Sequence, residues 1–407
     1  MPNVIFRHED GTAVEVAVTA GENLLEVARK ANVAIDAPCS GNGSCGKCRV
    51  KYVSGELETE KTRHISDEEF EEGWRLSCLS KVTGDVEVMV PDIASAYKSR
   101  MKVADLSSRK EVAIFDKARE EVAESGIAFQ NVFSVVDLSM DEPTLDDTMP
   151  DNERLIRAVQ EATGAEHVGL TYQALKKLPD VLREQQFHVS AVLKNMDGKL
   201  MVYDVRPSGE EKLCAAAIDI GTTTVSGVIL DMRDGKILAK ASSGNGQIRF
   251  GADVINRIIE SRKEGGQEKL QKAIIEETIN PMFHNMCHAA GIHGSSIYHM
   301  CVASNTTMNH LFAGVNADPL RMEPYIPAFF ETDSINAYDL GLHVHPDASV
   351  VIAPNIGSYV GGDITAGTLV SMIWNKPEFN LFIDLGTNGE IVFGNSDFMM
   401  SCACSAG

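Results

Sequence analysis

The sequence predicts a multidomain chain of mixed α/β and α+β class. Three observations support this expectation. The 407 residues are enough for two to four domains. Short alternating strands surround a group of cysteines in the first 90 residues or so, and a strand–turn–strand unit occurs twice in the second half.

The composition excludes two classes of partner. The net charge of −21 argues against a nucleic-acid partner, because phosphate binding needs basic patches. No apolar run approaches the length needed to span a bilayer, so we expect no membrane partner. The N-terminus has no apolar signal core, and the expected location is cytoplasmic.

Four cysteines have a spacing typical of iron–sulfur ligation. Cys39, Cys45 and Cys48 follow the pattern C-x5-C-x2-C with glycines between them, and Cys78 comes after 29 intervening residues. Plant-type [2Fe–2S] proteins use C-x4-C-x2-C and a distant fourth cysteine. Zinc and unligated thiols are the alternatives, but structural zinc sites usually pair two short-spaced knuckles, whereas Cys78 stands alone. We therefore favour a [2Fe–2S] cluster on these four cysteines.

The elements around the cysteines follow a recognisable order. We expect strands at 3–8 and 13–18, a helix at 23–31, a strand at 49–53, an acidic helix from Ser66 and a strand at 85–90. This order resembles the β-grasp [2Fe–2S] ferredoxins over residues 1–92. The resemblance implies an electron-carrying domain.

Two segments without a ligand pattern follow. Residues 93–130 are expected to be a linker with one helix near 110–125. Residues 131–208 are expected to form a small α/β middle domain, with an acidic loop at 141–150 and a hairpin that turns at Asp197-Gly198. Its polar residues converge on no catalytic pattern, which favours a spacer or docking module.

The repeated unit predicts a phosphate clamp. Ile-Asp-Ile-Gly-Thr-Thr at 218–223 and Ile-Asp-Leu-Gly-Thr-Asn at 383–388 lie 165 positions apart, each after an apolar strand. Each copy places a carboxylate at a strand end and a glycine at the turn, where backbone amides and threonine hydroxyls can meet phosphate oxygens. Turn chemistry would explain one copy. Two copies in register favour a clamp.

This pattern resembles the actin, sugar-kinase and heat-shock ATPase superfamily, whose two duplicated lobes close on ATP. The resemblance implies a partial actin-like (ribonuclease-H-like) ATPase domain at 209–407, with the first lobe and the start of the second. In the catalytic role, Asp219 and Asp384 would hold Mg²⁺, mostly through its waters. The residues expected to bind ATP are Gly221, Thr222, Thr223, Thr224, Gly361, Gly362, Asp363, Gly386, Thr387, Asn388 and Gly389. The superfamily's adenosine loop has no match, and we expect the chain to be truncated within this domain.

The whole order, including residues 245–257 and 303–311, resembles the reductive activators of corrinoid proteins in anaerobic methyl-transfer pathways. The resemblance implies an ATP-hydrolysing iron–sulfur enzyme that passes one electron to a Co(II) corrinoid and regenerates Co(I). The implied partners are a corrinoid protein of a methyltransferase system and an upstream low-potential electron donor, and a homodimer is compatible. The chain lacks the cobalamin motif Asp-x-His-x-x-Gly, which assigns the corrinoid to the partner.

Two other functions stay open at this stage. One is a [2Fe–2S] electron-transfer protein without ATPase activity, and the other is an ATP-driven activator of a non-corrinoid enzyme. The Asn305-Thr306-Thr307 stretch either approaches the nucleotide or caps a helix.

Overall fold

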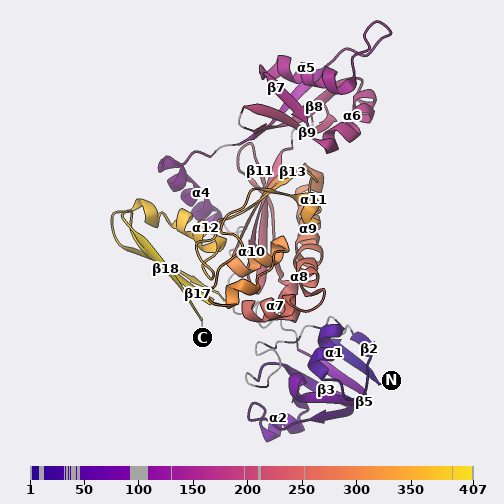
Figure 1. Cartoon of the computed structure of the whole chain (residues 1–407), viewed down its shortest axis with the longest axis vertical. Helices are drawn as coiled ribbons and strands as arrows, with labels where there is room; N and C mark the ends of the chain where they lie inside the picture. The colour runs from indigo at the N-terminus through magenta and orange to yellow at the C-terminus, as the bar shows by residue number, and fades with distance from the viewer. Residues whose placement is uncertain are drawn as a thin grey trace.

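The computed structural model describes residues 2–8, 13–31, 33, 35, 37, 43, 46–91, 109–129, 131–196, 198–209, 212–251, 253–386 and 388–405. These residues form four sheets with helices packed on them, which confirms the predicted mixed fold class. Figure 1 shows the six-stranded sheet in the middle, with the N-terminal sheet at one end and the four-stranded sheet at the other. No helix in these ranges is both long and apolar enough to cross a membrane.

The N-terminal sheet has the strand order β2-β1-β5-β3-β4. Its elements are β1 (Asn3–His8), β2 (Ala13–Ala17), α1 (Leu24–Lys30), β3 (Arg49–Thr59), α2 (Asp67–Glu71), β4 (Trp74–Leu76), the 3₁₀ turn η1 (Ser77–Leu79) and β5 (Ser80–Val90). Helix α1 begins after Asn23, whose side chain accepts a hydrogen bond from the amide of Leu25. The apolar face of α1 packs on the sheet and closes the core of this unit.

Strand β3 continues beyond the predicted end at residue 53. Its pairing with β5 shifts register near Gly55, which has a φ of +106°. A Cβ at Gly55 would lie 2.0 Å from the carbonyl oxygen of Asp85. A bulge at a glycine lets the strand bend and then resume its pairing, so the polar stretch after residue 53 remains extended.

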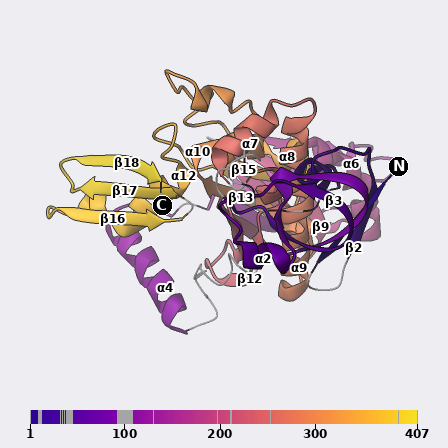
Figure 2. The same cartoon turned by 90° about the horizontal axis from the view of Figure 1, so that it is seen from below.

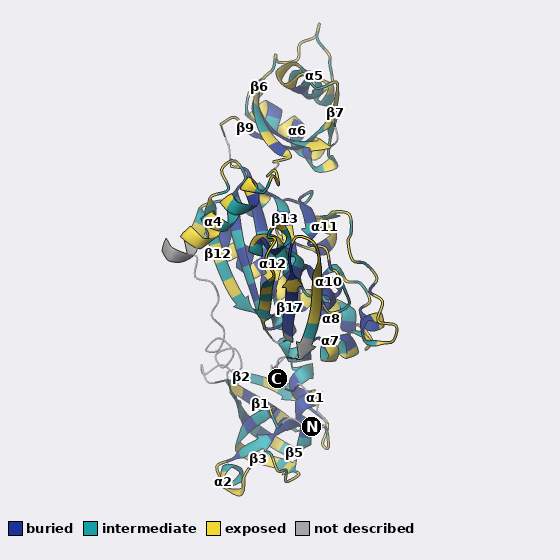
Figure 3. Ribbon diagram, turned by 90° about the vertical axis from the view of Figure 1, so that its left-hand side faces the viewer, coloured by how far each residue is buried: buried dark blue, intermediate teal, exposed yellow. Residues whose placement is uncertain are grey.

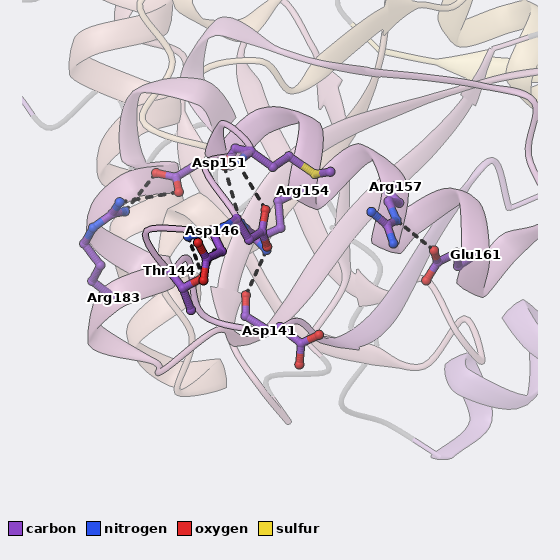
Figure 4. A network of polar contacts seen from close by, with 10 residues as sticks. Asp141, Thr144, Asp146, Asp151, Arg154, Arg157, Glu161 and Arg183 are labelled. Atoms are coloured by element: carbon purple, nitrogen blue, oxygen red, sulfur yellow. Dashed lines mark hydrogen bonds and ion pairs between the residues drawn. The ribbon is translucent and has the colours of Figure 1, made fainter.

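The middle unit is a four-stranded sheet with the order β6-β8-β9-β7. Its elements are β6 (Phe133–Ser139), α5 (Asp151–Thr163), β7 (His167–Leu170), α6 (Tyr172–Glu184), β8 (His188–Met196) and β9 (Lys199–Pro207), preceded by α4 (Arg109–Glu124). Arg154, 7% exposed, donates to the carbonyl of Asp141 at 3.1 Å (Figure 4). It also donates to the carboxylate of Asp147 at 2.7 Å. These bonds hold the acidic loop against α5.

The central sheet has the order β12-β11-β10-β13-β15-β14, and β10, β13 and β15 run parallel. This is the ribonuclease-H-like arrangement expected for one lobe. Its strands are β10 (Cys214–Ile220), β11 (Thr224–Asp231), β12 (Ile237–Gly244), β13 (Ile297–Ser304), β14 (Ile335–Asn336) and β15 (Ser349–Ile352). Figure 3 shows buried residues concentrated along these strands.

Helices and turns cover this sheet. They are η2 (Gly246–Phe250), α7 (Val254–Ser261), α8 (Gly266–Ile274), the π-helical turn η3 (Ile275–Ile279), α9 (Asn280–Ala290), η4 (Gly294–Ser296), α10 (Thr306–Ala313), η5 (Asp318–Arg321) and α11 (Ala337–Leu340). The helical stretch from Gly266 to Ala290 is interrupted by the π-helical turn. This turn carries Thr278, whose hydroxyl donates back to the carbonyl of Ala273.

A buried polar contact joins the middle unit to the central sheet. The hydroxyl of Tyr298 at the start of β13 donates to Asp204 of β9 at 2.6 Å, and Lys177 of α6 forms an ion pair with the same carboxylate. Phe133 and Tyr203 pack against Tyr298 in a shared apolar cluster. Asp204 is 2% exposed, so this joint excludes water from its centre.

The C-terminal sheet has the order β16-β17-β18. It comprises β16 (Asn380–Leu385), β17 (Asn388–Gly394) and β18 (Met399–Ser405), preceded by α12 (Gly362–Ser371) and the turn η6 (Ile373–Asn375). A Cβ at Gly367 would lie 2.5 Å from the Phe382 ring, so glycine lets α12 pack closely on β16. Helix α4 packs against α12 on the outside (Figure 2).

Candidate functional site

The first predicted phosphate turn joins β10 to β11. Ile220 pairs with Val225, so residues 221–224 form the tip of an antiparallel hairpin. A Cβ at Gly221 would lie 2.6 Å from the carbonyl oxygen of Thr224, which requires glycine at this position. Thr222 and Thr223 are buried against the lobe.

Three side chains from outside the hairpin hold this turn. Asn245, at the start of η2, donates from its side chain to the carbonyl of Gly221 at 2.9 Å, and its amide donates to the carbonyl of Thr223 at 2.8 Å. Asn305 donates to the hydroxyl of Thr222 at 3.3 Å. Arg257 of α7 donates to the carbonyl of Thr222. Both sequence stretches that supported the family resemblance, 245–257 and 303–311, therefore contact the turn.

Asn305 has two contacts at once. Its side-chain oxygen accepts from the amide of Met308 at 2.9 Å and caps α10, while its side-chain nitrogen reaches Thr222. The structure thus supports the helix-cap interpretation and also places the same residue beside the first turn.

The second predicted turn joins β16 to β17. Leu385 pairs with Gly389 and Asp384 with Glu390, so Gly386 lies at the tip of this hairpin. Asn388 begins β17. Thr387 lies outside the described residues, as do Cys39 and Cys45.

The start of α12 lies against the end of β13. Cβ atoms at Gly361 and Gly362 would lie 2.4 Å from backbone atoms of Asn305 and Ala353, respectively, so both positions need glycine. Asp363 follows in the first turn of the helix, and its carboxylate accepts from the amide of Ile364 at 2.8 Å. The glycine pair thereby brings the helix N-terminus next to the residues that hold the first turn.

Burial and the nearby Asp384 raise the pKa of three carboxylates from three other elements, Asp219, Asp363 and Glu390. Part of the Asp219 residue is exposed, but the surrounding protein removes much of the water from its carboxylate. This desolvation, together with the nearby Asp363 and Asp384, raises the pKa of Asp219 to about 7. Burial, with Asp384 nearby, also raises the pKa of Asp363 to about 6. Burial together with Asp363 and Asp384 raises the pKa of Glu390 to about 7. This concentration of negative charge suits a divalent cation.

Among the described residues, no three His, Cys, Asp or Glu side chains form a group that could hold a metal ion. A hydrated Mg²⁺ needs no such group, because magnesium usually keeps several of its waters in protein sites.

Sequence reasoning did not single out Glu390. The residue lies between Gly389 and the apolar run Ile391-Val392-Phe393. A lone carboxylate next to an apolar strand was a usable signal, because charged residues are rarely buried without a function or a partner.

The two described cysteines of the predicted cluster meet. Cys48 precedes β3 and Cys78 lies in η1, and their sulfur atoms are 3.1 Å apart. The amide of Ser77 donates to the carbonyl of Cys48 at 2.8 Å, and Asn23 donates to the carbonyl of Cys78 at 2.8 Å. Two adjacent buried sulfurs from distant loops fit the ligand set of an iron–sulfur cluster.

Models of known families match almost the whole chain. The model of the 2Fe-2S iron-sulfur cluster binding domain matches residues 7–83. The RACo linker region matches residues 122–212, the RACo middle region matches 214–376, and the C-terminal domain of RACo, the ASKHA domain, matches 378–407.

Individual relatives agree with these matches. The corrinoid activation enzyme RamQ of Eubacterium limosum is 28% identical over 397 residues, which are 96% of this chain and 59% of that protein. A solved structure of a reductive activator for corrinoid, iron–sulfur protein is 34% identical with a TM-score of 0.59, over 100% of this chain and 63% of that one. One component of the Na⁺-translocating NADH-quinone reductase of Actinobacillus succinogenes is 38% identical over 85 residues, 20% of this chain and 21% of that protein.

The chain spans less than two thirds of the length of the first two of these relatives. It carries a cluster-binding domain followed by the three RACo regions in order, and it belongs to the RACo family.

Proposed function

We propose that this chain acts in the ATP-dependent reductive activation of a corrinoid protein. The observation that carries the proposal is the presence, in one chain, of adjoining cysteine sulfurs and of two Asp-x-Gly hairpins, in which the nearby Asp384 of the second helps to raise the pKa of Asp219 in the first. The printed names of the two long relatives, a corrinoid activation enzyme and a reductive activator, agree with it.

The electron would come from the N-terminal domain. A [2Fe–2S] cluster held by Cys39, Cys45, Cys48 and Cys78 would supply one electron, which reduces Co(II) to Co(I) in the corrinoid of the partner. An upstream low-potential donor would then return one electron to the oxidised cluster. The hydrogen bonds to the carbonyls of Cys48 and Cys78 hold both ligand loops in place for this exchange.

The nucleotide would lie between the two hairpins. Gly221 to Thr224 and Gly386 to Gly389 would present amides and hydroxyls to the phosphates, and Asp219 and Asp384 would hold Mg²⁺ through its waters. The Gly361-Gly362 pair would let the N-terminus of α12 approach the same phosphates, with Asp363 beside them.

ATP has an energetic role in this proposal. Plant-type clusters have potentials near about −400 mV, and reduction of a base-off corrinoid is expected to need a lower potential. Each 59 mV of uphill one-electron transfer costs about 1.4 kcal/mol, so a gap on the order of 100 mV requires a few kcal/mol. A nucleotide that binds the closed lobes more tightly than the open lobes can supply this energy.

The test compares the chain with an Asp219→Ala variant. Each protein is purified without oxygen, reduced and mixed with a Co(II) corrinoid protein, with and without Mg-ATP, while cobalt absorption reports Co(I). We expect Co(I) to form with the unchanged chain and ATP, and the ATP effect to disappear in Asp219→Ala. An Asp333→Ala variant, altered at an exposed position of the same lobe, serves as the control and should behave as the unchanged chain does. An Asp219→Ala protein that activates the partner at the original rate would refute the ATPase assignment.

A further inference from the structure

Two loops beside the central sheet expose large apolar side chains. The first loop runs from η5 to β14, and the second runs from β15 to α12. Their exposed apolar side chains are those of Met322, Tyr325, Ile326, Phe330, Ile356 and Tyr359. Single apolar residues are common on protein surfaces, whereas a contiguous group marks an interaction site.

Hydrogen bonds hold the two loops side by side. The hydroxyl of Ser358 donates to the carbonyl of Tyr325. The amide of Asn355 donates to the carbonyl of Phe330 at 2.8 Å. The six exposed side chains therefore belong to one surface, which we call the two-loop surface.

Buried polar side chains of α10 support this surface. The side-chain amide of Asn309 donates to the side-chain oxygen of Asn355 at 2.8 Å. The imidazole of His310 donates to the carbonyl of Thr306 at 2.7 Å and accepts from the amide of Ala328, in the first loop, at 3.0 Å. Asn309 and His310 are fully buried, so losing these bonds would be costly and the loops are held in place. A surface that is fixed before binding loses less conformational entropy when a partner docks.

The same helix joins the two-loop surface to the first phosphate turn. The hydroxyl of Thr306 donates to the carbonyl of Gly357, in the second loop, at 2.6 Å. The preceding residue, Asn305, donates to the hydroxyl of Thr222 at 3.3 Å. A change at the phosphate turn can therefore reach the loops through two consecutive residues at the start of α10.

The charge around the two-loop surface indicates which kind of molecule binds there. Glu323, Glu331 and Asp333 are exposed on the first loop. The two loop segments, 322–334 and 353–361, contain no Lys, Arg or His residue. A second copy of the chain would bring these carboxylates together across a two-fold axis, where like charges repel. A different protein, with an apolar patch and a basic rim, is complementary to the surface.

We propose that the two-loop surface docks the corrinoid protein, which contacts it through an apolar patch with a basic rim. This inference rests on the proposed function. Among possible partners the corrinoid protein fits best, because its proposed activation depends on ATP and the loops are hydrogen-bonded to residues that hold the first phosphate turn. Mg-ATP and the corrinoid protein then change each other's affinity by the same factor.

The test removes apolar contacts at positions away from the phosphate turns. One variant carries Ile326→Asn and Ile356→Asn, one substitution in each loop, at residues that are 61% and 55% exposed. The control is Leu175→Asn, which alters an exposed side chain on α6, outside both loops. Each protein retains its cluster, is reduced without oxygen and is titrated with the Co(II) corrinoid protein, with and without Mg-ATP. The Kd for Mg-ATP, the visible absorption of the cluster, the melting temperature and the molecular mass in solution are measured as well.

We expect the double variant to raise the Kd for the corrinoid protein at least about 10-fold, because apolar anchors at the contact are lost. Its Kd for Mg-ATP and its melting temperature should stay close to those of the unchanged chain, since substitutions of exposed residues usually have small effects. Leu175→Asn should dock as the unchanged chain does. A further variant, Glu331→Gln with Asp333→Asn, should make docking less sensitive to salt, because part of the acidic rim is removed.

The outcomes separate this inference from the proposed function. If the unchanged chain forms Co(I) with ATP and the double variant docks as tightly, the docking surface is wrong and the proposed function remains. Lost Mg-ATP binding or a lower melting temperature in the double variant also overturns the inference, since a structural effect would then explain weaker docking. A dimeric chain that the double substitution converts to a monomer assigns the surface to a second copy and overturns the inference too. An unchanged chain that neither binds nor reduces the corrinoid protein overturns both proposals. Weaker docking with an intact cluster, retained Mg-ATP binding and an unchanged melting temperature supports the inference.

Discussion

Arg257 provides a test of how the first phosphate turn is held. The perturbation is Arg257→Met, which keeps an unbranched chain of similar reach but removes every donor. The side chain is fully buried. Its guanidinium donates to the carbonyl of Gly251 at 2.9 Å, to the side-chain oxygen of Gln247 at 3.3 Å, and to the carbonyl of Thr222.

The magnitude follows from these bonds. Each buried acceptor that loses its donor costs about 1–3 kcal/mol, and three acceptors lose theirs. Removal of a buried charge offsets part of this cost, because burial lowers the pKa of Arg257 to about 9 and the charged form is already disfavoured. We expect a net loss of about 3 kcal/mol of local stability, equivalent to roughly 100-fold more frequent opening of the turn.

Amide hydrogen exchange of residues 221–224 and 245–251 measures this opening directly. Arg262→Met is the matched control, because Arg262 lies at the end of the same helix, is 56% exposed and contacts Asp318 at 3.6 Å. Its loss should change exchange by less than a few fold. If Arg257→Met leaves exchange around the first turn unchanged, the turn does not depend on this guanidinium and the reasoning fails.

Three further predictions concern the acidic group, the cluster and the joint between units. Burial raises the pKa of Glu390 from 4.5 to about 7. The folded state is therefore stabilised by the protonated form fully below about pH 4.5, and this stabilisation is lost as the pH rises through 7. The free energy of unfolding should fall by about 3 kcal/mol in total. Without Mg²⁺, the melting temperature should be lower at pH 8 than at pH 5.5, and Glu390→Gln should reduce this difference. Cys78→Ser should lose most bound iron and the visible absorption of the cluster, because a soft thiolate ligand is removed. Tyr298→Phe should weaken the joint at Asp204 by about 1–2 kcal/mol, measured by urea unfolding.

Each of these three predictions has a result that would contradict it. Equal melting temperatures at both pH values would show that the protonation of Glu390 is not linked to stability. Iron retained in full by Cys78→Ser would exclude that residue as a ligand, whereas Cys402→Ser, altered at an exposed cysteine, should retain its iron in any case. Tyr338→Phe removes an exposed hydroxyl and should leave the free energy of unfolding unchanged. If Tyr298→Phe also leaves it unchanged, the hydrogen bond from Tyr298 contributes little to stability.

Local patterns were sufficient to predict most elements and the fold class. Period-two alternation predicted β1 and β2, and helical spacing predicted α1. The continuation of β3 was missed, because a bulge at Gly55 breaks the alternation that identifies a strand. The π-helical turn between α8 and α9 has no local signature either, since it preserves the helical composition around it.

The sequence by itself determined the four-cysteine pattern, the repeated hairpin and the order of the units, because each depends on residues close together in the chain or on a recurring motif. The tertiary structure decided which distant groups meet. Arg257 and Asn305 reach the first turn, and Glu390 faces Asp384 and Asp363, only because parallel strands, a helix and a hairpin register bring them together. Burial of a charge likewise depends on packing from several elements at once, so the apolar run after Glu390 was a signal of that burial and not its cause.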